Sequence, residues 1–195
     1  SEMCIRDRHL DGAPSTEFQA IPPELGEKLY GVPTAGDQTA YEGKGKLTFW
    51  YSCFKALVDS LGFCYYTSYW GDHSLLGPED YAQLFSAAVG EEFSAQSLLH
   101  IGQRIVNVEK TFNTIHKGFS RQDDLPPKIF TSEKIKTGKY KGHYLDMREW
   151  NSMLDEFYSH HEWDQQTGWQ TRACLENLEL DDVLPLLEST GRIPR

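Results

Sequence analysis

Apolar side chains recur every three or four positions in four long segments of this sequence, which is the spacing of one face of an α-helix. The segments are residues 38–64, 78–90, 94–118 and 146–158. In the third, the apolar residues follow alternating spacings of three and four: Leu98, Ile101, Ile105, Val108 and Phe112. Two shorter helices are expected near 171–177 and 180–190. No segment alternates as a half-buried strand would, so the predicted fold class is all-α.

Residues with strong preferences for helix ends indicate where these helices begin and end. Ser94 is a predicted N-cap, because its hydroxyl can accept a hydrogen bond from the first helical turn. Gly90 and Gly118 can adopt the left-handed conformation that commonly ends a helix. Asp146 is followed three residues later by Glu149, which is the pattern of a capping box. Helix boundaries are therefore predicted together with the helices.

The segments between the predicted helices are rich in turn-forming residues. Residues 9–37 contain many prolines and glycines and predict a loop with one short helical turn near 24–29. Residues 121–127 predict a turn, because proline does not fit a helix interior, and residues 128–144 predict an excursion loop. We expect one irregular helical domain with long loops, which suits a chain of 195 residues.

Composition narrows the possible partners. The net charge is −10 and no basic stripe is visible, which argues against nucleic acid. No run approaches the roughly 18 apolar residues of a membrane span, so no membrane partner is expected. The four cysteines are too scattered for a disulfide framework or a zinc site, and the sequence has no signal peptide, so a cytoplasmic protein is predicted. They are Cys4, Cys53, Cys64 and Cys174.

The first eight residues have an unusual composition. Residues 1–8 spell Ser-Glu-Met-Cys-Ile-Arg-Asp-Arg, which resembles translated adapter sequence at the end of an assembled read. We expect this leader to be non-native and the domain to cover residues 9–195. The alternative is a genuine loop that enters from an upstream domain.

One short motif at the end of the first long predicted helix contains side chains that could bind a ligand or a metal. It is the segment Asp59-Ser-Leu-Gly-Phe-Cys64. An ionised carboxylate accepts two hydrogen bonds, which suits a ligand ring with paired N–H donors, and carbonyls at a helix C-terminus can accept from the same donors. A thiolate is the usual protein ligand of cluster iron. A lone cysteine is also often a small buried hydrophobe, so the motif alone leaves both readings open.

This motif resembles an Asp-x-x-Gly-Leu-Cys element of the aldehyde:ferredoxin oxidoreductase family. In this chain, Phe63 stands where the family usually has Leu. The resemblance implies that Asp59 and the nearby Leu61, Gly62 and Phe63 contact a pterin. It also implies that Cys64 is the last of four ligands to a 4Fe-4S cluster. The remaining three ligands would come from a Cys-x-x-Cys-x-x-x-Cys run, which is absent from this sequence and expected upstream.

Further blocks of the same resemblance follow in order along the chain. They are residues 101–113, 118–126, 154–158, 162–164 and 168–171. The sequence departs from the family pattern at Lys110, where the family has Arg, at Glu162, where it has Gly, and at Gln170, where it has Pro. Several polar residues inside these blocks are expected to fix the turn after the long helix rather than to act in catalysis: Arg104, Glu109, Asn113, Arg121 and Asp124.

One histidine and one aromatic group remain as candidates on the strength of the resemblance. The family has a proton-transferring histidine upstream of the cluster cysteine, and His9 lies at a suitable interval before Cys64. Imidazole suits proton transfer because it titrates near neutral pH. Aromatic residues just after Cys64 line either a substrate funnel or the core: Tyr65, Tyr66, Tyr69 and Trp70.

The resemblance implies the C-terminal part of an enzyme that oxidises aldehydes to carboxylic acids. Its cofactors would be a tungsten (or molybdenum) bis-pterin and a 4Fe-4S cluster, and its partners ferredoxin, a small aldehyde and the missing N-terminal part of the same enzyme. A homodimer is also compatible with the family, and this part alone is not expected to be active. Two alternatives remain: a fragment of a tungsten benzoyl-CoA reductase type enzyme, and a cofactor-free helical interaction module in which Cys64 is buried.

Overall fold

The computed structural model describes residues 15–194, and this part is built from helices joined by loops. The α-helices are α1 (Thr16–Gln19), α2 (Pro23–Tyr30), α3 (Lys44–Ser60), α4 (Pro78–Val89), α5 (Ala95–Lys117), α6 (Lys128–Ser132), α7 (Met147–His160), α8 (Arg172–Asn177) and α9 (Leu184–Thr190). Short 3-10 helices are η2 (Tyr65–Thr67), η3 (Arg121–Asp124) and η4 (Asp181–Val183). The described residues contain no strand, only two isolated β-bridges, so the all-α prediction is confirmed.

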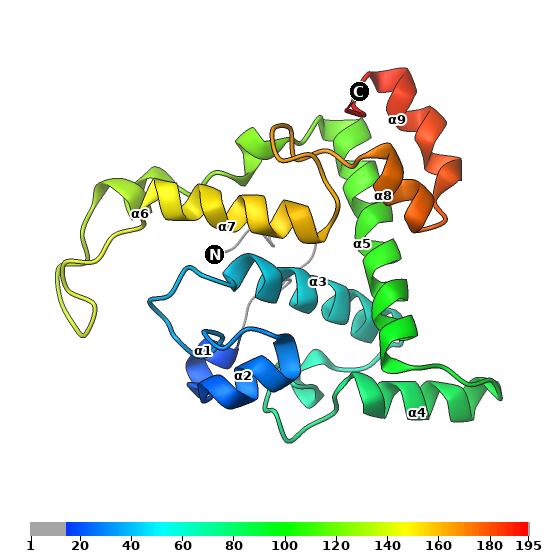
Figure 1. The fold of residues 1–195 in the computed structure, drawn as a ribbon, viewed down its shortest axis with the longest axis horizontal. Helices are drawn as coiled ribbons and strands as arrows, with labels where there is room; N and C mark the ends of the chain where they lie inside the picture. Colours follow the sequence, from blue (N-terminus) through cyan, green and yellow to red (C-terminus); the bar gives the residue numbers. More distant parts are fainter. Residues whose placement is uncertain (1–14, 195) are drawn as a thin grey trace.

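Helix α3 is the centre of the arrangement. Figure 1 shows α3 and α7 side by side, with α5 crossing at their ends, α1 and α2 below α3, and α8 and α9 beside the end of α5. Close backbone approaches make this packing possible. A Cβ on Gly45 of α3 would lie 2.5 Å from the Met153 carbonyl oxygen of α7, and a Cβ on Gly102 of α5 would lie 2.1 Å from the Cys53 carbonyl oxygen of α3.

The predicted helix ends of α4, α5 and α7 are confirmed. The Ser94 hydroxyl accepts a hydrogen bond from the Ser97 backbone N–H at 3.0 Å at the start of α5. Gly90 and Gly118 end α4 and α5 with φ of 78° and 70°. The Asp146 carboxylate caps α7 by accepting from the Arg148 N–H at 2.7 Å. Local side-chain chemistry therefore determines these ends.

Two segments differ from their predictions. The first long helix spans only Lys44–Ser60, because Gly43 precedes it with φ of 75° and the chain before it forms turns. The segment 128–144 is not all loop, since its first five residues form α6. After α6, a hairpin-like return is held by backbone hydrogen bonds of 2.8 Å from the Ile135 N–H to the His143 oxygen and from the Gly142 N–H to the Ile135 oxygen.

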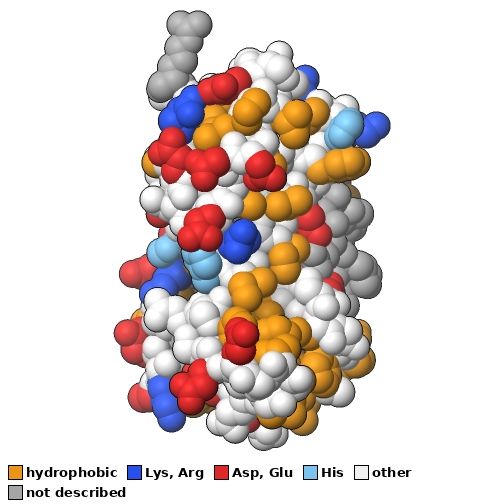
Figure 2. Space-filling view, turned by 90° about the vertical axis from the view of Figure 1, so that its right-hand side faces the viewer, with side chains coloured by type: hydrophobic (Ala, Val, Ile, Leu, Met, Phe, Trp, Pro, Cys, Tyr) orange, Lys and Arg blue, Asp and Glu red, His pale blue; other side chains and the backbone are white. Residues whose placement is uncertain are grey.

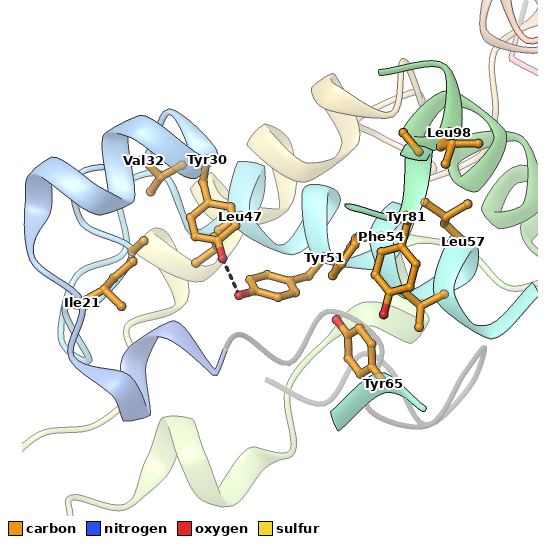
Figure 3. Packing of buried hydrophobic residues seen from close by; sticks show 13 residues of the cluster. Ile21, Tyr30, Val32, Leu47, Tyr51, Phe54, Leu57, Tyr65, Tyr81 and Leu98 are labelled. Atoms are coloured by element: carbon orange, nitrogen blue, oxygen red, sulfur yellow. Dashed lines mark hydrogen bonds between the residues drawn. The ribbon is translucent and has the colours of Figure 1, made fainter. Parts of the chain in front are cut away.

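Two clusters of buried side chains stabilise the fold, and α3 contributes to both. The first is shown in Figure 3 and includes Tyr30, Leu47, Tyr51, Phe54, Leu57, Tyr65, Tyr81 and Leu98. The second includes Ala56, Val106, Trp150, Leu154, Tyr158, Trp163, Leu175, Leu184 and Leu187. Within the first, the Tyr30 and Tyr51 hydroxyls are 2.9 Å apart, and the Tyr30 hydroxyl is 3.0 Å from His73 Nε2. These bonds connect α2, α3 and the loop before α4.

The apolar residues that indicated α5 are not the ones it buries, apart from the first and the two that are half-buried. Leu98 is buried, but Ile101 and Ile105 are only half-buried, and Val108 and Phe112 are 46% and 62% exposed. The positions that α5 does bury are mostly small or polar: Leu98, Gly102, Val106, Asn107, Lys110, Thr111 and Thr114. Apolar periodicity alone therefore identified the helix but not the side that faces this core.

A hydrogen-bond network explains how α5 buries polar residues. The Asn107 side-chain oxygen accepts from Trp163 Nε1 at 2.9 Å and from Gln170 Nε2 at 2.8 Å. Gln170 Oε1 in turn accepts from the Thr111 hydroxyl at 3.0 Å. Because buried polar groups are costly only when they lack partners, this network lets α5 pack a polar side against the second cluster. Gln170, which stands where the family pattern has Pro, is a member of it.

Candidate functional site

The segment from Asp59 to Cys64 forms the C-terminal end of α3. Gly62 has φ of 76°, the Gly62 N–H donates to the Asp59 carbonyl at 3.0 Å, and the Phe63 N–H donates to the Val58 carbonyl at 3.2 Å. These two bonds and the left-handed residue constitute a Schellman motif. A Cβ on Gly62 would meet no atom within 4 Å, so backbone conformation rather than space requires glycine there. The chain is thereby turned sharply out of α3.

The Asp59 carboxylate is held by a lysine one helical turn earlier. Lys55 Nζ lies 2.6 Å from Asp59 Oδ1 and 2.5 Å from Oδ2. The Lys55 side chain is almost buried, and its Nζ is 5.0 Å from the centre of the Tyr65 ring, whereas the Asp59 side chain is 32% exposed. The lysine compensates the carboxylate charge and restricts its rotamer, while about a third of the Asp59 side chain stays exposed. Sequence reasoning missed Lys55, although its i, i+4 spacing to Asp59 is a recognisable signal.

Leu61 and Phe63, on either side of Gly62, differ in their burial and contacts. Leu61 is the half-buried C-cap residue and packs against the first cluster. Phe63 is 41% exposed, and its ring meets Tyr81 edge-on with centroids 5.3 Å apart. Of the aromatic residues that follow, Tyr65 is buried and stacks on Trp70 at 5.5 Å, whereas Tyr66 is 60% exposed. Core packing thus accounts for Tyr65, and an open aromatic surface remains at Phe63 and Tyr66.

Cys64 differs from the other described cysteines in its accessibility. Cys64 is exposed, while Cys53 and Cys174 are buried. Burial raises the pKa of the Cys174 thiol to about 12, which makes it a poor metal ligand at neutral pH. The Cys64 carbonyl accepts hydrogen bonds from the Thr67 hydroxyl at 2.7 Å and from the Thr67 N–H at 3.0 Å, so η2 fixes the backbone at this position. Of the three, Cys64 has the accessibility that ligation requires.

The described residues do not contain a complete ligand set for a metal cluster. Between residues 15 and 194, no group of three or more His, Cys, Asp or Glu side chains is placed to hold a metal ion. One exposed thiol beside one partly exposed carboxylate fits a single ligand and a single ring contact of a larger site. The remaining ligands would have to come from outside these residues. His9, the predicted proton-transfer residue, lies outside the described residues.

The polar residues after α5 include two with clear structural roles. Arg121 Nη1 donates to Asp155 Oδ1 at 2.6 Å and to the Gln165 carbonyl at 2.7 Å, and its Nη2 donates to Asn151 Oδ1 at 3.1 Å. The Asp124 carboxylate accepts from the Tyr158 hydroxyl at 2.5 Å. These bonds connect η3 to α7 and to the loop after it, in agreement with the predicted role of Arg121 and Asp124 in fixing the turn.

A large cavity lies away from the Asp59–Cys64 segment. It has a volume of about 980 Å³ and lies among the start of α3, α6, the hairpin-like return and α7. Its walls are mostly apolar and include Ile129, Phe130, Trp150 and Phe157. Lys44, at its edge, pairs with Glu17 at 2.8 Å and donates to the Ala35 carbonyl at 3.2 Å. Neither residue belongs to the predicted site.

Comparisons with known proteins agree on one family. A family model described as aldehyde ferredoxin oxidoreductase, domains 2 & 3, matches residues 5–180. The tungsten-containing aldehyde ferredoxin oxidoreductase of Pyrococcus furiosus is 34% identical over 155 residues, covering 79% of this chain and 24% of that protein. The protein of the same name from Thermococcus kodakarensis is 33% identical over 161 residues, covering 82% and 25%. The chain therefore spans about a quarter of the length of these relatives.

A solved structure shares the fold. It is described as the active site complex BamBC of benzoyl coenzyme A reductase with 1,5 dienoyl-CoA, and it matches with a TM-score of 0.61 and 21% identity. The match covers 80% of this chain and 22% of that one. None of the helices between residues 15 and 194 combines the length and apolar character needed to cross a membrane.

Proposed function

The chain belongs to the aldehyde ferredoxin oxidoreductase family, and on that premise we propose that it is the C-terminal part of a tungsten- or molybdenum-containing bis-pterin oxidoreductase. The reaction converts an aldehyde and water to a carboxylic acid, two protons and two electrons. The electrons would pass through a 4Fe-4S cluster to ferredoxin. The observation that carries the proposal is the end of α3, where an accessible thiol and a partly open carboxylate lie five residues apart.

Each residue of that segment has a distinct proposed role. Cys64 provides one thiolate to cluster iron, and its exposed position after a sharp turn leaves room for the cluster. Asp59 accepts hydrogen bonds from the N–H edge of a pterin, in an orientation set by Lys55. Leu61, Gly62 and Phe63 shape the contact, and Gly62 has no side chain to obstruct it.

The protein residues orient and insulate, and the bound groups supply the redox chemistry. His9 is proposed to accept a proton as water adds to the aldehyde carbon, because imidazole titrates near neutral pH. Phe63 and Tyr66, each with an exposed ring, are proposed to help exclude water from a bound cofactor. We further propose a cytoplasmic enzyme, with the rest of the polypeptide providing the other cluster ligands.

The test is replacement of Cys64 in the protein encoded by the complete gene. Cys64→Ser is expected to lower iron content severalfold and to abolish the visible absorption of the cluster and electron transfer to ferredoxin. Cys174→Ser is the matched control, because this buried thiol donates to the His161 carbonyl at 3.1 Å and a serine can do the same. If Cys64→Ala, which has no ligating atom at this position, retains full iron content, Cys64 is not a ligand. The cofactor-free helical module would then be the better hypothesis.

A second candidate function has a specific observation in its favour. The similarity in fold to the benzoyl coenzyme A reductase complex supports a related enzyme that reduces an aromatic ring. The two activities are separable with the same purified protein: one consumes an aldehyde and reduces ferredoxin, the other consumes an aromatic acyl-CoA and requires a reductant. Turnover of the acyl-CoA without aldehyde oxidation would replace the first proposal by the second.

A further inference from the structure

Helix α5 has an apolar stripe whose first two residues pack against the buried clusters and whose last two residues are exposed. The stripe consists of Ile101, Ile105, Val108 and Phe112, and its last two residues are 46% and 62% exposed. At 100° per residue, these positions lie roughly opposite the buried Val106, Lys110 and Thr114. Figure 2 faces α5 and shows hydrophobic side chains along it that continue over the end of α4 below, where Leu84 and Val89 are about half exposed.

We propose that this α5 stripe is the docking surface for the remainder of the same polypeptide. One side of α5 already packs on α3 and the second cluster, with its polar groups bonded internally. A helix that is packed on one side and has exposed apolar residues on the opposite side is typical of a larger protein, in which both sides are covered. Contiguous exposed apolar surface of this kind marks an interaction site.

The size of the relatives identifies the occupant. This chain corresponds to about a quarter of their length, and the matching family model is described as domains 2 & 3, so the relatives have a further domain and most of their chain outside the matched part. The centre of the stripe contains Ile, Val and Phe without a charged residue, which is the composition of a permanent interface. A transient electron carrier is expected to meet a smaller and more polar surface.

The start of the stripe lies against α3, the helix that carries Asp59. Leu61 and Ile101 pack against the same buried cluster, and Gly102 touches the α3 backbone at Cys53. The stripe therefore begins where α5 lies against α3, the helix that precedes Cys64. A domain seated on the stripe would be held in a fixed position relative to Cys64, which a shared cluster requires. In this respect the inference deepens the proposed function and rests on it.

The experiment uses the protein encoded by the complete gene, with the photocrosslinking residue p-benzoylphenylalanine at position 112. Irradiation is expected to join position 112 to a peptide outside residues 15–194 of the same molecule, seen by mass spectrometry, while the protein keeps its monomer mobility on a denaturing gel. The control has the same probe at Leu186, which is 53% exposed on α9. Crosslinking mainly to a second copy would overturn the proposal, as would equal yields from both positions.

A pair of substitutions provides an independent readout. Phe112→Glu in the same protein is expected to lower the midpoint of thermal unfolding by several degrees, because a charge would be buried in the interface. Phe112→Leu, which keeps an apolar side chain there, is expected to have a midpoint close to that of the wild type. Leu186→Glu should leave the midpoint unchanged. An unchanged midpoint in Phe112→Glu overturns the proposal. Neither readout requires iron or turnover, so the docking surface and the Cys64 assignment fail separately.

Discussion

At the scale of single residues, departures from a family pattern acquire physical meaning once the backbone is known. Glu162 stands where the family pattern has Gly, and its φ is 57°, in the left-handed region. Non-glycine residues pay about 1–2 kcal/mol for that conformation. The sequence contained the signal, because a Gly in the family pattern suggests positive φ, but only the structure shows that Glu162 keeps this conformation.

Glu162→Gly should therefore raise the free energy of unfolding by at most roughly 0.5–1 kcal/mol. The relief of backbone strain is partly offset by the larger entropy of the unfolded glycine chain. The exposed hydrogen bond from Asn177 to Glu162, 2.8 Å long, is a small loss. The matched change Glu176→Gly lies inside α8 and should cost about 1 kcal/mol, since glycine disfavours helix. Urea unfolding of both variants measures the difference, and a loss for Glu162→Gly as large as that for Glu176→Gly would contradict the strain.

His161 is the second residue whose behaviour the sequence alone did not indicate. It is fully buried, it stacks on Trp163 with ring centroids 4.1 Å apart, and neither ring nitrogen has a hydrogen-bond partner among the described residues. Burial, and then the positive charges of Lys110 and His160, hold its pKa well below the usual value. The folded protein therefore contains a neutral imidazole.

Below about pH 6.5 the unfolded chain binds a proton at this position that the folded protein does not. The free energy of unfolding should fall as the pH decreases through that range, by at most about 1.4 kcal/mol per pH unit from this group. His161→Phe should flatten the dependence and raise stability by roughly 1–2 kcal/mol, because an unsatisfied ring is replaced by an apolar one. The control is His100→Phe at an exposed position on α5. If the free energy of unfolding depends on pH in the same way in wild type and His161→Phe, the neutral state of the buried His161 is contradicted.

At the scale of elements, the sequence predicted the helices and their ends better than their orientation. Caps such as Ser94, Gly118 and Asp146 act through local bonds, so their effect is visible in the sequence. The buried side of α5 depends on partners far along the chain. Asn107 becomes a core residue only because Trp163 and Gln170 reach it, 56 and 63 residues away. Tertiary context therefore overrode the apolar periodicity.

The crossing of α3 and α5 gives a prediction at the same scale. Helix propensity alone favours Gly102→Ala by about 1 kcal/mol. A Cβ there would lie 2.1 Å from the Cys53 carbonyl oxygen, which forces the two helices apart, so we expect a net loss of about 1–3 kcal/mol. Gln96→Ala, exposed on the first turn of α5, should change stability by less than about 0.5 kcal/mol. Denaturant midpoints compare the two, and a stabilising Gly102→Ala would mean that the helices are less closely packed.

At the scale of the whole molecule, the candidate site was predictable only in part. Cys64 and Asp59 were identified by their motif, and the structure places both at one helix end, with Lys55 as an unforeseen partner. The rest of the proposed centre depends on residues outside the described chain. The same holds for the proposed docking surface, because its partner also lies outside the described residues, whereas the exposure of Val108 and Phe112 is visible in the fold.

The two buried clusters should nevertheless unfold together, because α3 contributes Phe54 and Leu57 to the first and Ala56 to the second. Leu175→Ala removes a fully buried side chain from the second cluster and should cost about 2–5 kcal/mol. In a cooperative unit, native-state hydrogen exchange should show this loss equally in α7 and in α4, which packs on the first cluster. Faster exchange in α7 alone, with α4 unchanged, would divide the molecule into two independently unfolding parts. Helix α3, which leads to Cys64, would then be the boundary between those parts, rather than a rigid support for the site.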